Sequence, residues 1–238
     1  MLSEKKITPG EKKHSREKLE TPITVRIKFT KTGNLQFISH LDLQRTFHRI
    51  LVRSNIPMWY TQGFNPHAKL VFGLPLSIGT QSVCEMADLR LDRKISLEEI
   101  KDQLNEQLTD EMQVIEAYYP TAKFNDIAYA DYTITIKSEN ISKETEIAAT
   151  ALFAAPIIMT KKSKSGEKEV DITNFIKKIE FSACDGELTA SAVLCAGTSE
   201  NLNPEYIVTA LKTLNFGECP VYSIMRNRVF DKYLIEFK

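Results

Sequence analysis

The sequence predicts an α+β protein built from two similar halves, and three observations lead to this prediction. At 238 residues the chain is long enough for two cores of about 100 residues each. The apolar fraction of 42% and the charged fraction of 26% are ordinary for a globular protein. Strand and helix patterns follow the same order in both halves: strand, helix, two strands, helix, strand. That order is typical of a ferredoxin-like sandwich (β-α-β-β-α-β), so the predicted fold is two tandem ferredoxin-like units.

The predicted boundaries are a tail, two folded units and a linker. Residues 1–22 carry many charges and few apolar side chains, so they cannot offset the entropy lost on ordering and are expected to be flexible. The first unit is expected at 23–122, the linker at 123–130 and the second unit at 131–238.

In the first unit, residues 24–30 alternate apolar and charged side chains, as a half-buried strand does. Ser39 followed by Asp42 predicts a capped helix start, and Leu43, Phe47, Ile50 and Leu51 then share one helical face. The remaining elements are an extended piece at 57–60, strands at 69–78, 83–91 and 112–119, and a helix from the cap Ser96 to Leu108.

In the second unit the same periodicity predicts strands and helices in the same order. The expected strands are at 132–136, 157–161, 187–194 and 221–230, and the expected helices are at 143–155, at 172–179 as a short one, and from Pro204 to Leu214.

Charge is uneven along a chain whose net charge is zero. Residues 26–90 carry eight Lys or Arg against three Asp or Glu and hold three of the four histidines, whereas residues 91–156 carry six against thirteen. A basic first half favours an anionic partner there, although folding can bring the two signs together and cancel the field.

Two features of the first half are candidates for binding RNA. Arg45, Arg49 and Arg53 recur every four residues beside His48, a spacing that can meet successive phosphates, although a solvated helix face explains it as well. The loop Gly63–Lys69 places Phe64, Asn65, His67 and Lys69 where a base could stack and a phosphate be held. The alternative is a rigid turn whose Phe64 fills the core.

Other candidates carry less weight. Lys161 and Lys164 belong to a basic stretch that could grip a phosphate backbone, but nearby acidic residues dilute its field. His40 and Asp42 at the helix start could form an acid–base pair, yet helix capping is the simpler explanation. With no GxSxG, HExxH or P-loop pattern, no catalytic residue is assigned, and His40 and His67 are the only candidates.

The four cysteines stand far apart and form no CxxC pair, so free thiols are expected, with no metal and no cofactor. No apolar stretch approaches the length of a membrane span and the N-terminus lacks the apolar core of a secretory signal, so a cytoplasmic protein is expected.

Four segments resemble the radical SAM-linked protein family, a domain family of unknown function: FISHLDL at 37–43, GFNPHAK at 63–69, LPLSIG at 74–79 and KSGEKEVDI at 164–172. The resemblance implies a radical SAM protein as partner, because members are fused to or encoded beside one. The chain lacks a CxxxCxxC cluster motif, so it is expected to be the stand-alone form, with any radical chemistry in the partner.

Three hypotheses follow. The first is an accessory protein that binds structured RNA, ribosomal or transfer RNA, for a radical SAM partner. The second is an RNA-processing enzyme that uses His40 or His67 as acid or base, and the third is a pure protein-interaction module that docks through the acidic middle segment.

Overall fold

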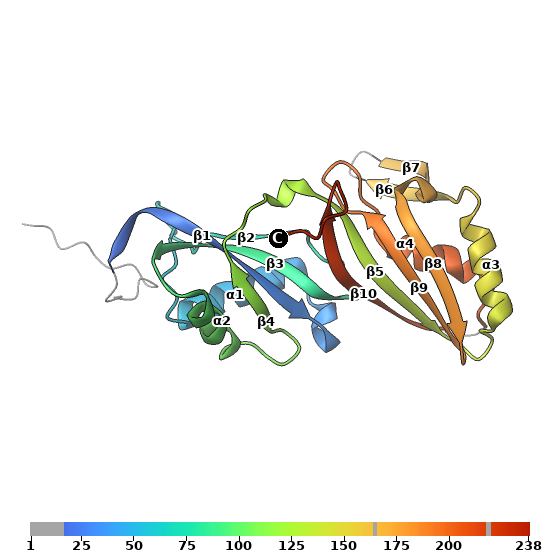
Figure 1. Ribbon diagram of the computed structural model, residues 1–238, viewed down its shortest axis with the longest axis horizontal. Coiled ribbons are helices and arrows are strands. Elements are labelled where there is room, and N and C mark those ends of the chain that lie inside the picture. Colours follow the sequence, from blue (N-terminus) through green and yellow to red (C-terminus); the bar gives the residue numbers. More distant parts are fainter. Residues whose placement is uncertain (1–16, 164–165, 218–219) are drawn as a thin grey trace, which may run out of the picture. The chain divides into compact units, whose positions relative to one another are not determined.

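The computed structural model describes residues 17–163, 166–217 and 220–238 (Figure 1). Within these ranges the chain forms ten β-strands, four α-helices and four short 3-10 helices, so the protein is a mixed α+β protein. It divides into two compact units, one holding the residues up to Ile78 with Glu85–Thr121, the other Gly79–Cys84 with Ala122–Lys238.

The first unit contains four strands and two α-helices. In chain order these are β1 (Lys18–Lys31), α1 (His40–Arg53), β2 (Leu70–Phe72), β3 (Thr80–Arg93), α2 (Leu97–Asn105) and β4 (Val114–Tyr118), with the 3-10 helix η1 (Gly33–Phe37) after β1. The strands pair in the order β4-β1-β3-β2. β4 runs antiparallel to β1, and β2 runs antiparallel to β3.

Both helices of the first unit pack on one face of its strands. Val25, Ile27 and Phe29 alternate along β1, so they share a face of the strand. They form one buried cluster with residues of the other elements: Leu43, Phe47, Ile50 and Leu51 of α1, Leu89 and Leu91 of β3, and Ile100 and Leu104 of α2. The cluster anchors the apolar face of α1 and turns its opposite face to solvent.

The second unit contains six strands, two α-helices and three 3-10 helices among the described residues. Its elements are the 3-10 helix η2 (Phe124–Asp126), β5 (Ile127–Lys137), α3 (Lys143–Phe153), β6 (Ile158–Ser163), β7 (Gly166–Asp171), η3 (Ile172–Phe175), β8 (Ile176–Cys184), β9 (Glu187–Cys195), α4 (Glu205–Leu211), η4 (Lys212–Leu214) and β10 (Val221–Asp231). The strands pair in the order β10-β5-β9-β8, and all three neighbouring pairs are antiparallel.

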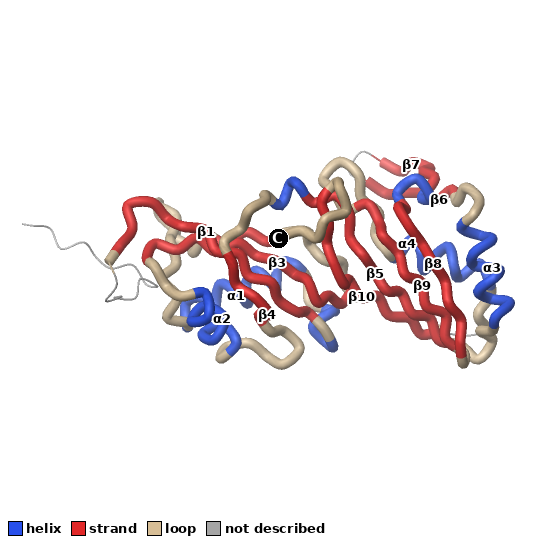
Figure 2. Tube along the Cα trace, viewed as in Figure 1, coloured by secondary structure: helices blue, strands red, loops and turns tan. Residues whose placement is uncertain are grey.

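Two features distinguish the second unit from the first. The first residues of β3, Thr80–Ser82, belong to the second unit and pair in parallel with β10, so the sheet of that unit is mixed. The hairpin β6–β7 forms a two-stranded sheet of its own, drawn apart from the longer strands in Figure 2. Its two strands pair from Ile158 with Asp171 up to Ser163 with Gly166.

The structure corrects several predicted elements. The helix predicted at 172–179 is wrong, because only η3 is helical and the strand β8 begins at Ile176. The strand predicted at 157–161 is extended but pairs only within the hairpin β6–β7. The strand predicted at 69–78 is shorter, Leu70–Phe72, since Pro75 offers no N–H for a ladder bond.

The predicted boundaries also change. Residues 18–22 of the predicted tail belong to β1, and residues 1–16 lie outside the described residues. The predicted linker 123–130 consists largely of η2 and the first residues of β5, whose Ile127 and Ala130 are buried.

Candidate nucleic-acid interface

Helix α1 begins where the sequence predicts and holds its arginines toward solvent. Ser39 is the N-cap, and its hydroxyl accepts a hydrogen bond from the backbone N–H of Asp42 at 3.1 Å. Because the apolar face of α1 is anchored in the core, Arg45, Arg49 and Arg53 are all exposed.

A second row of α1 residues lies at the half-buried edge of the helix. His40, Gln44 and His48 stand on successive turns. The Nε2 atoms of His40 and Gln44 are 3.0 Å apart, and the His40 ring meets Phe72 edge to face at 5.4 Å between centroids. These contacts tie His40 to its own helix and to an aromatic group inside the first unit.

His48 instead faces the loop that the sequence singled out. Its ring lies 6.3 Å from the ring of His67, centroid to centroid, at an interplanar angle of 81°. The helix stripe and the loop, which the sequence offered as separate candidates, therefore meet at these two histidines. We give the name α1–loop surface to the half-buried His48 together with six exposed residues: Arg45, Arg49, Phe64, Asn65, His67 and Lys69.

The loop is closed at its base by backbone pairs. Tyr60 and Ala68 form an antiparallel bridge, and the N–H of Lys69 donates to the carbonyl of Trp59 at 3.0 Å. Inside this base, the N–H of Thr61 donates to the carbonyl of His67 at 3.0 Å. The loop tip is thus held on a short ladder.

Phe64 stands at the tip of this loop with a relative exposure of 112%. The alternative in which this ring fills the core is therefore wrong. Burial of an aromatic ring is a large favourable term in folding, so a fully exposed phenylalanine on a braced loop is a ring available to a ligand.

The cations of the surface differ in what they already contact. Arg45 Nη1 lies 3.3 Å from Asp42 Oδ1, so part of its charge is compensated. Among the described residues, the side chains of Arg49 and Lys69 have no ion pair or hydrogen bond, and both are exposed. These two are the cations best placed to take an anionic ligand.

The environment of His48 favours its neutral form. Partial burial lowers the pKa of His48 below its ordinary value, and the charge of the nearby His67 lowers it further. Asp42, at the start of the same helix, has a lowered pKa as well, mainly because the Ser39 hydroxyl donates to its carboxylate.

Sequence reasoning missed Thr61 and Gln44. The Thr61 hydroxyl accepts from the backbone N–H of His67 at 3.2 Å and lies 3.1 Å from His67 Nδ1. Thr61 and His67 come together only when the loop closes, so nothing in the sequence indicates their contact. The contact between His40 and Gln44 was predictable, because residues four apart on a helix are neighbours.

The second-half lysines belong to the sequence of the second unit, outside the α1–loop surface. Lys161 lies in β6, opposite Lys168 in the hairpin ladder, and Lys164 lies outside the described residues.

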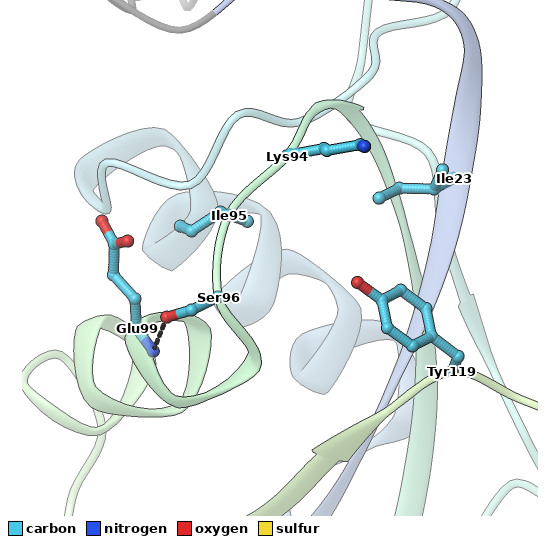
Figure 3. Close-up of a pocket in the computed structure, with 6 residues that line it drawn as sticks. All are labelled: Ile23, Lys94, Ile95, Ser96, Glu99 and Tyr119. Atoms are coloured by element: carbon cyan, nitrogen blue, oxygen red, sulfur yellow. Dashed lines mark hydrogen bonds between the residues drawn. The ribbon is translucent and has the colours of Figure 1, made fainter.

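A cavity of about 590 Å³ lies elsewhere in the first unit (Figure 3). It is lined by Ile23, Lys94, Ile95, Ser96, Glu99 and Tyr119. The Ser96 hydroxyl that lines it caps α2 by accepting from the N–H of Glu99 at 3.1 Å. None of the predicted site residues lines this cavity.

Three findings concern metals, thiols and membranes. Among the described residues no three His, Cys, Asp or Glu side chains gather where a metal ion could be held. Cys84 and Cys195 are buried free thiols, Cys184 is an exposed one, and Cys219 lies outside the described residues. No helix in the described part of the chain has the length and apolarity to span a bilayer.

Residues 24–204 match a family described as an uncharacterized protein conserved in bacteria (DUF2344). The chain belongs to this family. The match runs from β1 to the cap of α4, so it includes the whole α1–loop surface. No curated protein matches the sequence.

Among solved structures, the chain is similar to a chain of a Cbf5-Nop10-Gar1 complex at 14% identity, with a TM-score of 0.47 over 94% of this chain. It is also similar to a chain of the archaeal box H/ACA sRNP Nop10-Cbf5 complex at 13% identity, with a TM-score of 0.42 over 85% of this chain. The chain spans 60% and 46% of the length of those two chains. A likeness of this degree carries no functional argument.

Proposed function

We propose that this member of the DUF2344 family is an accessory RNA-binding protein and that RNA binds on the α1–loop surface. Arg49 and Lys69 would contact backbone phosphates, and Phe64 would stack on an unpaired base. The combination of exposed cations and an exposed aromatic ring is the one by which proteins hold single-stranded segments and loops of structured RNA.

One observation carries the proposal: the contact between His48 and His67, at 6.3 Å between ring centroids. It joins the helix stripe to the loop, so cations and aromatic ring belong to one surface of the first unit. A merely solvated helix face would not explain a neighbouring loop that exposes Phe64 completely.

The partner is proposed from the sequence resemblance to the radical SAM-linked family. In this view the protein presents ribosomal or transfer RNA to a radical SAM enzyme. The sequence contains no CxxxCxxC motif, so the cluster chemistry would belong to that enzyme.

We also propose that each unit is a ferredoxin-like sandwich. If the hairpin β6–β7 is left out of the count, each unit has four strands. The fourth of these pairs with the first, the first with the third, and the third with the second. The hairpin β6–β7 would then be an insertion in the second sandwich.

Reversing the charge of Arg49 tests RNA binding directly. We expect Arg49→Glu to weaken binding to structured RNA and to reduce the slope of log affinity against log salt by about one, because one phosphate contact is lost. The measurement is fluorescence anisotropy between about 50 and 200 mM salt. The free energy of unfolding should hardly change, since Arg49 is exposed and has no ion pair with described residues.

A matched control is Lys101→Glu, which makes the same charge change on α2 at a lysine already 3.7 Å from Glu98. It should leave RNA affinity nearly unchanged. Equal losses of RNA affinity in both variants would mean that only the net charge of the protein matters. Full RNA affinity in Arg49→Glu would show that the arginines of α1 form a solvated helix face and do not bind RNA. If no RNA binds to the unmodified protein, the interaction-module hypothesis takes its place.

A further inference from the structure

We propose that His48 and His67 form an acid–base pair that cleaves a phosphodiester of RNA held on the α1–loop surface. This inference rests on the proposed function, since the substrate must be bound there first. The reaction class is intramolecular transesterification, in which the 2′-hydroxyl of one nucleotide attacks the phosphate that follows it.

His67 is oriented for proton transfer by its own loop. Its Nδ1 lies 3.2 Å from the backbone carbonyl oxygen of Asn65. A carbonyl oxygen can only accept, so this hydrogen bond places a hydrogen on Nδ1. Nε2 is then the nitrogen that gains and loses a proton, as in catalytic histidines whose other nitrogen is held by an acceptor.

Thr61 restrains the same ring from a second side. Its hydroxyl oxygen lies 3.1 Å from His67 Nδ1 and accepts from the backbone N–H of His67. The ring is thus fixed although His67 is exposed.

The surroundings of His48 differ from those of His67. His48 is half-buried on helix α1, and its ring nitrogens make no hydrogen bond to the described residues. Two imidazolium cations 6.3 Å apart repel each other, so the state in which both rings are charged is disfavoured. Burial lowers the pKa of His48 and favours its neutral form, which is the form that a general base requires.

The step is balanced without an oxidant, a reductant or a second substrate. Neutral His48 takes the proton of the 2′-hydroxyl while the 2′-oxygen forms a bond to phosphorus. The bond from phosphorus to the 5′-oxygen breaks, and protonated His67 gives its Nε2 proton to that oxygen. The products are a 2′,3′-cyclic phosphate end and a 5′-hydroxyl end, and one proton has passed from His67 to His48 by way of the substrate.

Arg49 and Lys69 supply the charge that this step needs. The phosphorane formed during attack carries more negative charge than the phosphodiester, so cations that are not already compensated stabilise it. Arg49 follows His48 directly on α1 and Lys69 lies two residues after His67, so each histidine has a cation close by in the chain.

The experiment incubates the full chain with a fluorescently labelled RNA stem-loop at about pH 7, where an imidazole can exchange protons, and separates the products by gel. We expect cleavage that leaves 2′,3′-cyclic phosphate ends. His67→Ala and His48→Ala should each lower the cleavage rate by about 100-fold or more while RNA still binds. A stem-loop with 2′-deoxy sugars throughout should remain intact, because it lacks the attacking hydroxyl.

His40→Gln is the matched control, because His40 lies two turns before His48 on the same helix but contacts Gln44 and Phe72 instead. It should cleave at the rate of the unmodified protein. RNA that binds with full affinity but stays intact would overturn the acid–base pair and leave the proposed function standing. Failure to bind RNA at all would overturn both, so affinity is measured on the same samples.

Discussion

At the scale of single residues, the turn after β10 holds a leucine in an unusual backbone conformation. Leu234 has φ of 62°, and the other described non-glycine residues with positive φ are Asp185 and Asn215, whose side chains tolerate it. Asp231 fixes the turn, because its Oδ1 accepts from the N–H groups of Tyr233 at 2.8 Å and Ile235 at 2.9 Å. The hydrogen bonds therefore hold a strained residue in place.

Replacing this leucine should stabilise the protein. The left-handed conformation costs an ordinary residue about 1–2 kcal/mol and costs asparagine less, so Leu234→Asn should raise the free energy of unfolding by up to about 1 kcal/mol. Urea denaturation measures the change. Leu234→Ala keeps the Cβ atom that causes the strain and should show no gain; an equal gain in both variants would assign the effect to the exposed leucine side chain instead.

Residue-level reasoning from the sequence identified the types of the site residues but not their contacts. Phe64 was open to two interpretations because periodicity says nothing about a loop, and only its position at the tip shows that it is exposed. The orientation of His67 depends on Thr61 and the Asn65 carbonyl, a closure that local patterns do not encode.

At the scale of elements, α1 was predictable and β8 was not. The cap Ser39 and the apolar face of α1 are local signals that agree with each other. In β8 the apolar residues Ile176 and Ile179 are three positions apart, which is a helical spacing. The strand accommodates this spacing by a register shift between Ile176 and Lys178, which breaks the alternation of a regular strand. Antiparallel pairing with β9, the next strand along the chain, decides the outcome.

The cap of α1 allows a prediction about stability and pH. Ser39→Ala should lower the free energy of unfolding by about 1 kcal/mol, because one N–H at the helix start loses its acceptor. The pKa of Asp42 is lowered in the folded state, so its contribution is present above its ordinary value of 3.8 and is lost as pH falls through the folded value. The Ser39 hydroxyl is the main cause of the lowered pKa of Asp42. The free energy of unfolding of Ser39→Ala should therefore depend less on pH below 3.8 than that of the unmodified protein. Denaturation curves at several pH values measure both effects, and Ser39→Asp, which retains a capping acceptor, is the control.

At the scale of the whole molecule, the sequence correctly predicted a mixed α+β protein, but it did not predict which strands pair, because the start of β8 was interpreted as a helix and residues 157–161 as a strand of the main sheet. The described residues of the candidate site all belong to the first unit, apart from Lys161. The hairpin β6–β7 was only partly predictable: residues 157–161 were predicted as a strand of the main sheet, whereas β7 was not predicted as a strand. Asp171 closes the base of this hairpin. Its Oδ1 accepts hydrogen bonds from the backbone N–H groups of Ile157 at 3.1 Å and Thr173 at 3.0 Å.

Shortening this hairpin tests whether it is an appendage and whether its lysines bind RNA. Met159 and Val170 are paired, so residues 160–169 can be replaced by an Asn-Gly turn that keeps the bonds of Asp171. Because the hairpin forms its own sheet, Tm should stay within about 2 °C of that of the full chain. A much larger fall would show that the hairpin supports the second unit. RNA affinity measured on the same protein then decides the role of Lys161 and Lys164: unchanged affinity confines the interface to the α1–loop surface, whereas a loss extends it to the basic hairpin.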